Sequence, residues 1–251
     1  FINNIAGEGG GIYVYGNPVN PPSPSDPPIH VKPVITDNTF TNNSAVVNHG
    51  FAPPDANYPV EEHGDGGAIV GFQGVDANII GNYLINNHAL NYGGGIHLRQ
   101  WSNGLIADNE IADNNSALGA GIHLTYTSSP TVRGNLIKAN IAGGLGGGGI
   151  YVYNLSKPLI ERNTITQNSS SNGAGIGVYY SSAPTIRDNF IYKNYVGAGL
   201  RIVSSSPKIL NNTITDNSSG GITCDFDSTP DINNNIITTN GNGRGIYIQN
   251  G

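Results

Sequence analysis

An asparagine-centred pattern is repeated eight times along this chain. In every repeat a second asparagine follows the first by five residues. The position three residues before the first asparagine is always Ile or Val, and the position two residues after it is always Ile, Leu or Phe. A fixed internal repeat constrains the fold strongly, because each unit must bury its apolar face against its neighbours. The first asparagines are Asn38, Asn82, Asn109, Asn135, Asn163, Asn189, Asn212 and Asn235.

A glycine–isoleucine-like pair opens each unit and recurs nine times. Apolar and other residues alternate after this pair, after the following proline and after the asparagine, which predicts three short half-buried strands per unit. From Ile69 onward the units are 22 to 28 residues long. We therefore expect an all-β parallel β-helix of about nine stacked coils around one narrow core. The apolar members of the pair are Ile12, Ile69, Ile96, Ile122, Ile150, Ile176, Leu200, Ile222 and Ile246.

The composition agrees with many turns around a thin core. The 251 residues include 36 Gly and 15 Pro, which disfavour long helices, yet 37% hydrophobic residues exceed what a disordered chain carries. The net charge of −6 argues against a nucleic-acid partner. No apolar run reaches the roughly 20 residues of a membrane span. The single cysteine, Cys224, falls in an inward column, so we expect a buried, inert thiol.

The asparagines predict a ladder at the turns. The first asparagine of each unit fits a tight turn between the second and third strands, because Asn tolerates the left-handed conformation. Its amide can hydrogen-bond to the equivalent asparagine of the next coil. Prolines at 33, 130, 158, 184, 207 and 230 are expected to open the second strand, where a missing N–H is tolerated.

Several segments resemble a known family over nearly the whole chain. GGGIYV, PTIRDNFI, PKILNNTI and PDINNNII are similar to the parallel β-helix repeats of the pectin-lyase-like superfamily. That resemblance implies a right-handed coil, with active sites on the outer face of the first strand. GGAI at 66–69, FINN at 1–4 and FTNN at 40–43 also resemble repeats of polymorphic outer-membrane adhesins.

The predicted organisation is one β-helix domain over residues 1–251, with insertions at 16–32 and 44–66. Insertions in a solenoid usually map to one face, often the binding face. Both ends fall inside repeats, so we expect either a segment of a longer array or a subunit that self-associates end to end through open coil ends.

One candidate catalytic group lies on the first-strand face. His97, Arg99 and His123 should come close together, since the two histidines occupy equivalent positions one coil apart. A histidine could act as a general base, and Arg99 could bind a uronate carboxylate. The plainer interpretation, which we favour, is two solvated surface histidines. The catalytic motifs of polygalacturonases, alginate epimerases and pectate lyases are not found.

Two further groups of candidate residues accompany it. Flat aromatic side chains near polar ones suit sugar rings, although aromatics also favour exposed strands for their own sake. Closely spaced carboxylates could bind Ca²⁺, although acidic turn residues are usually only solvated. The candidate glycan-contacting residues are Tyr15, Phe72, Trp101, Tyr126, Tyr151, Tyr153 and Tyr179. The candidate calcium ligands are Asp225, Asp227 and Asp231.

Two functions remain open. We favour an extracellular or cell-surface structural or adhesive rod that contacts a polysaccharide or surface glycan. The alternative is a polysaccharide lyase or glycoside hydrolase that acts on an acidic polysaccharide. Its groove would be walled by the two insertions, with His97, Arg99 and His123 at the floor.

Overall fold

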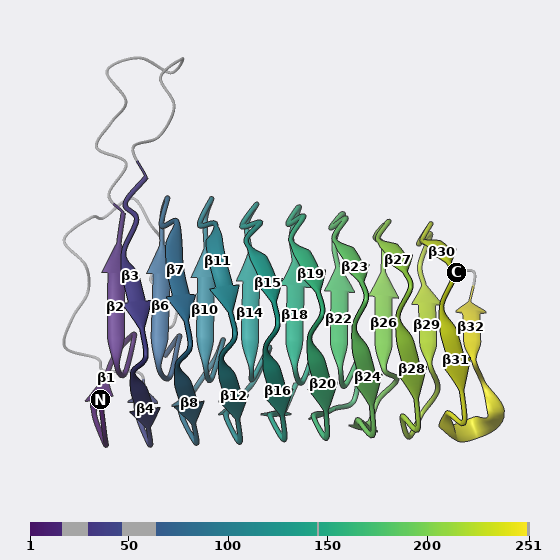
Figure 1. The fold of residues 1–251 in the computed structure, drawn as a ribbon, viewed down its shortest axis with the longest axis horizontal. Helices are drawn as coiled ribbons and strands as arrows, with labels where there is room; N and C mark the ends of the chain where they lie inside the picture. The colour runs from purple at the N-terminus through teal and green to yellow at the C-terminus, as the bar shows by residue number, and fades with distance from the viewer. Residues whose placement is uncertain (17–29, 47–63, 145, 250–251) are drawn as a thin grey trace, which may run out of the picture.

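The computed structural model describes residues 1–16, 30–46, 64–144 and 146–249. These residues form a straight solenoid in which successive coils lie side by side along one axis (Figure 1). Every strand pairing is parallel, and the strands form four sheets that run along the axis. The predicted all-β parallel β-helix is therefore confirmed. One short 3₁₀ turn, η1 (Gly241–Gly243), precedes the last strand.

Sheet 1 contains the strands that begin at the nine Gly-Ile positions, in the predicted register. Its strands are β2 (Ile12–Tyr15), β6 (Ile69–Phe72), β10 (Ile96–Arg99), β14 (Ile122–Thr125), β18 (Ile150–Tyr153), β22 (Ile176–Tyr179), β26 (Leu200–Val203), β29 (Ile222–Asp225) and β32 (Ile246–Gln249).

Sheets 2 and 3 contain the strands on either side of the first asparagine. Sheet 2 consists of β3 (Val34–Thr36), β7 (Ala77–Ile80), β11 (Gly104–Ala107), β15 (Thr131–Arg133), β19 (Leu159–Glu161), β23 (Thr185–Arg187), β27 (Lys208–Leu210) and β30 (Asp231–Asn233). Sheet 3 consists of β4 (Thr39–Thr41), β8 (Tyr83–Ile85), β12 (Glu110–Ala112), β16 (Leu136–Lys138), β20 (Thr164–Thr166), β24 (Phe190–Tyr192), β28 (Thr213–Thr215) and β31 (Ile236–Thr238).

A fourth strand, present in seven coils of the described chain, was not predicted, and for these coils the expectation of three strands is wrong. It follows the second asparagine and is only two residues long, which is too short to show an alternating pattern. Ser44–Ala45 is one such strand, so the predicted insertion at 44–66 begins inside a regular coil. Sheet 4 consists of β1 (Ile5–Ala6), β5 (Ser44–Ala45), β9 (His88–Ala89), β13 (Asn115–Ser116), β17 (Ile141–Ala142), β21 (Ser169–Ser170) and β25 (Tyr195–Val196). Most of both insertions, 17–29 and 47–63, lies outside the described residues.

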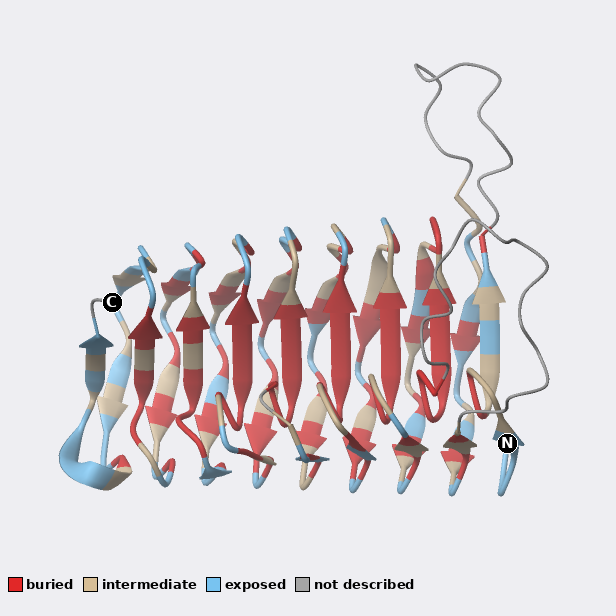
Figure 2. Ribbon diagram, turned by 180° about the vertical axis from the view of Figure 1, so that it is seen from behind, coloured by how far each residue is buried: buried red, intermediate tan, exposed pale blue. Residues whose placement is uncertain are grey.

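The core is a column of stacked aliphatic side chains along the axis. In the central coils the inward Ile, Val and Leu residues are completely buried, and sheet 1 is buried over most of its length (Figure 2). Cys224 is also buried, as predicted, and burial raises the pKa of its thiol to about 11. The third residue of each sheet 1 strand points inward, and Gly71 is the one glycine at this position. The Leu98 side chain fills the space that a side chain at position 71 would need.

Two asparagine ladders close the turns. In the second ladder the Asn114 side chain donates to Asn140 Oδ1 at 2.9 Å and to the Leu84 carbonyl at 2.9 Å. The predicted ladder is confirmed, but the left-handed residue is the one before each ladder asparagine. Asp108 and Asp113, for example, have φ of 54° and 56°, and they turn the chain so that Asn109 and Asn114 point inward.

A third ladder, made of serines, was missed. Ser102, Ser128, Ser156, Ser182 and Ser205 are buried in the turn after the first strand. The Ser102 N–H donates to Ser128 Oγ at 3.2 Å, and the Ser102 hydroxyl donates to the Arg99 carbonyl at 2.7 Å. The signal was present in the sequence, because from Ser128 onward these serines stand two residues before the proline that precedes the second strand.

Candidate functional site

The outer face of sheet 1 brings together most of the predicted site residues. Hydrogen-bonded register aligns His97 with His123 on β10 and β14, and aligns His123 with Tyr151 on β18. The last positions of the strands form a neighbouring column, in which Tyr15, Phe72 and Arg99 are aligned. The predicted proximity of His97, Arg99 and His123 is confirmed.

The histidines are buried, so the favoured interpretation of two solvated surface side chains is wrong. His97 and His123 are 1% and 3% exposed, and their rings stack with centroids 4.7 Å apart. His123 in turn stacks on Tyr151 at 5.2 Å. Tyr92 covers both imidazoles, with ring centroids 5.8 and 5.0 Å from those of His97 and His123.

Glycine residues allow a turn to pack closely over the two histidines. The turn before each first strand folds against the outward residue of that strand. A Cβ on Gly93 would lie 2.8 Å from the Cβ of His97, and one on Gly119 would lie 2.9 Å from that of His123. Both glycines have positive φ, which other residues adopt at a cost. A glycine three residues before the isoleucine was the sequence signal for a covered column.

The buried pair is electrostatically unusual. Asp65 Oδ2 lies 3.3 Å from His97 Nδ1, without hydrogen-bond geometry. Among the residues that the structure describes, none forms a hydrogen bond with any of the four imidazole nitrogens. Burial lowers the pKa of His123 well below its ordinary value, and the nearby His97 and Arg99 act in the same direction. A carboxylate beside an imidazole is a general-base arrangement, but both imidazoles are buried, with the Tyr92 ring against them. A catalytic role for His97, Arg99 and His123 stays a prediction.

A second, exposed group runs along the edge of sheet 1 where its strands end. We call it the aromatic strip, and it consists of Tyr15, Phe72, Arg99, Trp101, Tyr126, Tyr153 and Tyr180. The Tyr15 and Phe72 rings are 5.5 Å apart, and the Arg99 guanidinium lies 5.2 Å from the Phe72 ring and 5.3 Å from the Tyr126 ring. Tyr153 and Tyr180 meet edge to face at 4.9 Å. The strip contains five of the seven predicted glycan-contacting residues.

The strip is hollowed beside its tryptophan. A shallow groove of about 210 Å³ is lined by Trp101, Tyr126 and Leu155, with Gln100, Thr127 and Asn154 as polar neighbours. Trp101 is 50% exposed and Tyr126 is 40% exposed. Apolar rings beside hydroxyl and amide groups form a surface that suits a sugar.

The other two predicted tyrosines lie elsewhere. Tyr151 and Tyr179 are buried and meet edge to face at 5.2 Å. Burial raises the pKa of Tyr179 to about 12. Both lie beside Tyr153 of the strip, with the Tyr151 ring 5.6 Å from the Tyr153 ring and Tyr179 as the register partner of Tyr153.

The three candidate calcium ligands are not brought together. Asp225 on β29 is buried and accepts a hydrogen bond from Arg201 Nε at 2.8 Å. Asp227 lies in the following turn, and Asp231 opens β30 in sheet 2. In the part of the chain that the structure describes, no group of three or more His, Cys, Asp or Glu could hold a metal ion. Calcium binding stays a prediction.

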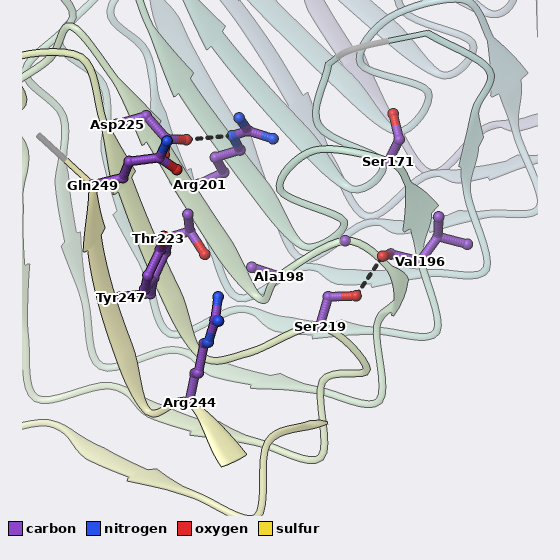
Figure 3. Close-up of a pocket in the computed structure, with 11 residues that line it drawn as sticks. Ser171, Val196, Ala198, Arg201, Ser219, Thr223, Asp225, Arg244, Tyr247 and Gln249 are labelled. Carbon is purple, nitrogen blue, oxygen red and sulfur yellow. Dashed lines mark hydrogen bonds and ion pairs between the residues drawn. The ribbon is translucent and has the colours of Figure 1, made fainter. Parts of the chain in front are cut away.

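Sequence reasoning missed two residues of this face. Tyr92 lies in the variable turn before the glycine run, where the repeat pattern gives no side-chain direction. Arg244 lies in the turn before β32 and lines a second hollow with Arg201 and Tyr247 (Figure 3). Among the described residues, no helix is long and apolar enough to cross a membrane.

Comparison with known proteins supports the fold assignment. The family model described as "Right handed beta helix region" matches residues 2–170 and 144–251, and these two matches together span nearly the whole chain. No curated protein and no solved structure matches it. The repeat, the four parallel sheets and the family match agree, and the chain belongs to the right-handed β-helix family.

Proposed function

We propose that this protein is an extracellular, carbohydrate-contacting structural rod that holds an extended polysaccharide along the aromatic strip. The β-helix fold supports a structural or carbohydrate-related role in general. The strip supports the finer proposal, because at six successive coils it presents a ring that is exposed or half-buried. From β2 to β22 it covers five coil spacings, or roughly 24 Å at about 4.8 Å each.

One observation carries the proposal. Trp101, Tyr126 and Tyr180 are exposed. Their φ angles are 56°, 52° and 53°, respectively, and lie in the left-handed region. A bulky residue there costs roughly 1–2 kcal/mol relative to a residue in an ordinary conformation. Asn or Gly would relieve this cost and would expose less apolar surface. The same turn holds polar residues in other coils, such as Asn154 and Ser204 with φ of 50° and 47°, so the conformation itself does not require aromatic side chains. We therefore attribute the exposed aromatics at these three turns of the strip to contact with a ligand.

The test separates binding from folding. Trp101→Asn and Tyr126→Asn are compared with the unchanged protein by affinity electrophoresis on a panel of neutral and acidic polysaccharides. For a retained polysaccharide we expect each variant to bind about tenfold more weakly, which corresponds to about 1.4 kcal/mol. We expect both variants to be at least as stable as the unchanged protein in urea.

Tyr83→Ala is the matched control, because Tyr83 is an exposed tyrosine (52%) in sheet 3, away from the strip. It should bind normally. The proposal fails if no polysaccharide is retained, or if the two strip variants bind as well as Tyr83→Ala.

A polysaccharide-cleaving enzyme is the second candidate, and the buried Asp65–His97 pair favours it. The same polysaccharides would be incubated with the protein and assayed for new reducing ends. Cleavage that is lost in His97→Ala but kept in His88→Ala would support this function. The absence of cleavage on every polysaccharide that binds would exclude it for those substrates.

Adhesion at a cell surface and end-to-end assembly belong to the structural proposal. Electron microscopy of the purified chain at micromolar concentration tests the assembly. Long filaments with one chain per axial repeat would support it, and isolated short rods would contradict it.

A further inference from the structure

A second hollow lies on sheet 1, at the coils of β26, β29 and β32. Its floor is a column of register partners, with Arg201 opposite Thr223 and Thr223 opposite Tyr247. The hollow measures about 260 Å³ and is also lined by Arg244 (Figure 3). In this view Thr223 lies between the two arginine side chains. The aromatic strip does not extend to these residues.

Arg244 is positioned but not neutralised. Its guanidinium lies 4.3 Å from the centroid of the Tyr247 ring, a cation–π contact that restrains the side chain. Among the described residues, no carboxylate lies within ion-pair distance of it. A guanidinium held over a ring keeps its N–H edges free for a planar, bidentate acceptor.

Arg201 is anchored on one side and open on the other. Its Nε donates to Asp225 Oδ2 at 2.8 Å, and its Nη1 donates to Asn172 Oδ1. Within the described part of the chain, Arg201 Nη2 donates no hydrogen bond. The two arginines and one carboxylate leave a local charge of +1, on a chain whose net charge is −6. An unpaired positive charge in a hollow of an acidic protein is a recognition feature for anions.

We propose that this hollow binds a carboxylate or sulfate group. Arg244 supplies two parallel N–H donors to the oxygens of the anion, the Thr223 hydroxyl supplies a third donor, and Arg201 contributes its positive charge to the lining of the hollow. The anion can be free in solution or attached to a polymer, since both present the same oxygens. The site is separate from the aromatic strip and does not depend on the proposed function.

The experiment follows the arginine side chains by nuclear magnetic resonance. The Nε–H resonances of ¹⁵N-labelled protein are recorded during titration with sodium acetate, sodium sulfate, a uronic acid tetrasaccharide and a neutral tetrasaccharide. We expect a saturable shift of the Arg244 resonance with at least one of the anions and none with the neutral sugar. Arg244→Gln should weaken that binding at least tenfold, and Thr223→Val should weaken it severalfold.

Two variants control for surface charge and for the strip. Arg133→Gln removes an exposed arginine from sheet 2 and should bind the anion normally. Trp101→Asn should also leave anion binding unchanged, so a failure of the strip is distinguishable from a failure of this site. Tighter binding of the uronate than of acetate or sulfate would assign the site to a polymer, and the reverse order would assign it to a free anion.

The proposal is overturned if no probe gives a saturable shift of Arg244. It is also overturned if Arg133→Gln weakens binding as much as Arg244→Gln, because the effect would then be one of overall charge.

Discussion

Replacement of one ladder asparagine tests how the coils are held together. Asn114 is completely buried, and its side chain takes part in four hydrogen bonds. Two are donated to Leu84 and Asn140, and two are accepted from the backbone and side-chain amides of Asn87. Asn114→Ala removes all four and leaves the buried Asn87 backbone N–H without its acceptor.

The expected cost follows from these contacts. A buried donor left unpaired costs about 1–3 kcal/mol, and each of the other lost bonds contributes about 1 kcal/mol, so we expect a loss of roughly 4–6 kcal/mol. Asn115 is the matched control, because it is the next residue and its side chain is exposed. Asn115→Ala should change stability by less than about 0.5 kcal/mol.

Urea unfolding followed by circular dichroism measures both variants, with hydrogen exchange to locate the opened coils. Exchange matters because a solenoid can lose local coils without unfolding as a whole. We expect faster exchange in the coils of Asn87 and Asn140 first. If Asn114→Ala lies within about 1 kcal/mol of Asn115→Ala, the ladder does not carry the stability assigned to it here.

Two further predictions concern the covered column and the core. Burial lowers the pKa of His123 below its ordinary value of 6.5, so the unfolded chain takes up a proton that the folded chain refuses. The contribution of His123 to stability should therefore be complete above about pH 6.5 and should fall as the pH drops below it. In unfolding titrations, His123→Gln should flatten the dependence of the unfolding free energy on pH in this range, and His88→Gln should not. Equal slopes for the two variants would contradict the assignment. Ile137 is completely buried, whereas Ile141 on sheet 4 is 52% exposed. Ile137→Ala should cost about 2–5 kcal/mol and Ile141→Ala less than about 1 kcal/mol in urea unfolding, and similar losses would argue against a single packed core.

The sequence by itself determined the solenoid. Inward positions recur at fixed spacing from the asparagines, so the register of sheets 1, 2 and 3 could be predicted residue by residue. Alignment of His97 with His123 followed from the same register. Local chemistry also predicted the ladder, because the side-chain amide of an asparagine that recurs at every coil finds its hydrogen-bond partners on the neighbouring coils.

Tertiary structure alone decided which outward residues are exposed. Period-two alternation distinguishes inside from outside on a strand, but it carries no information about a turn that folds back over the outer face. Gly93 and Tyr92 make such a cover, which buried His97 and His123 while Trp101 and Tyr126 stayed in solvent. The sequence could likewise not predict the pairing of Asp225 with Arg201. This ion pair joins two coils and depends on the directions of the two side chains, which the repeat spacing does not give. Core packing repeats with the sequence, whereas a surface site depends on contacts between turns that do not repeat.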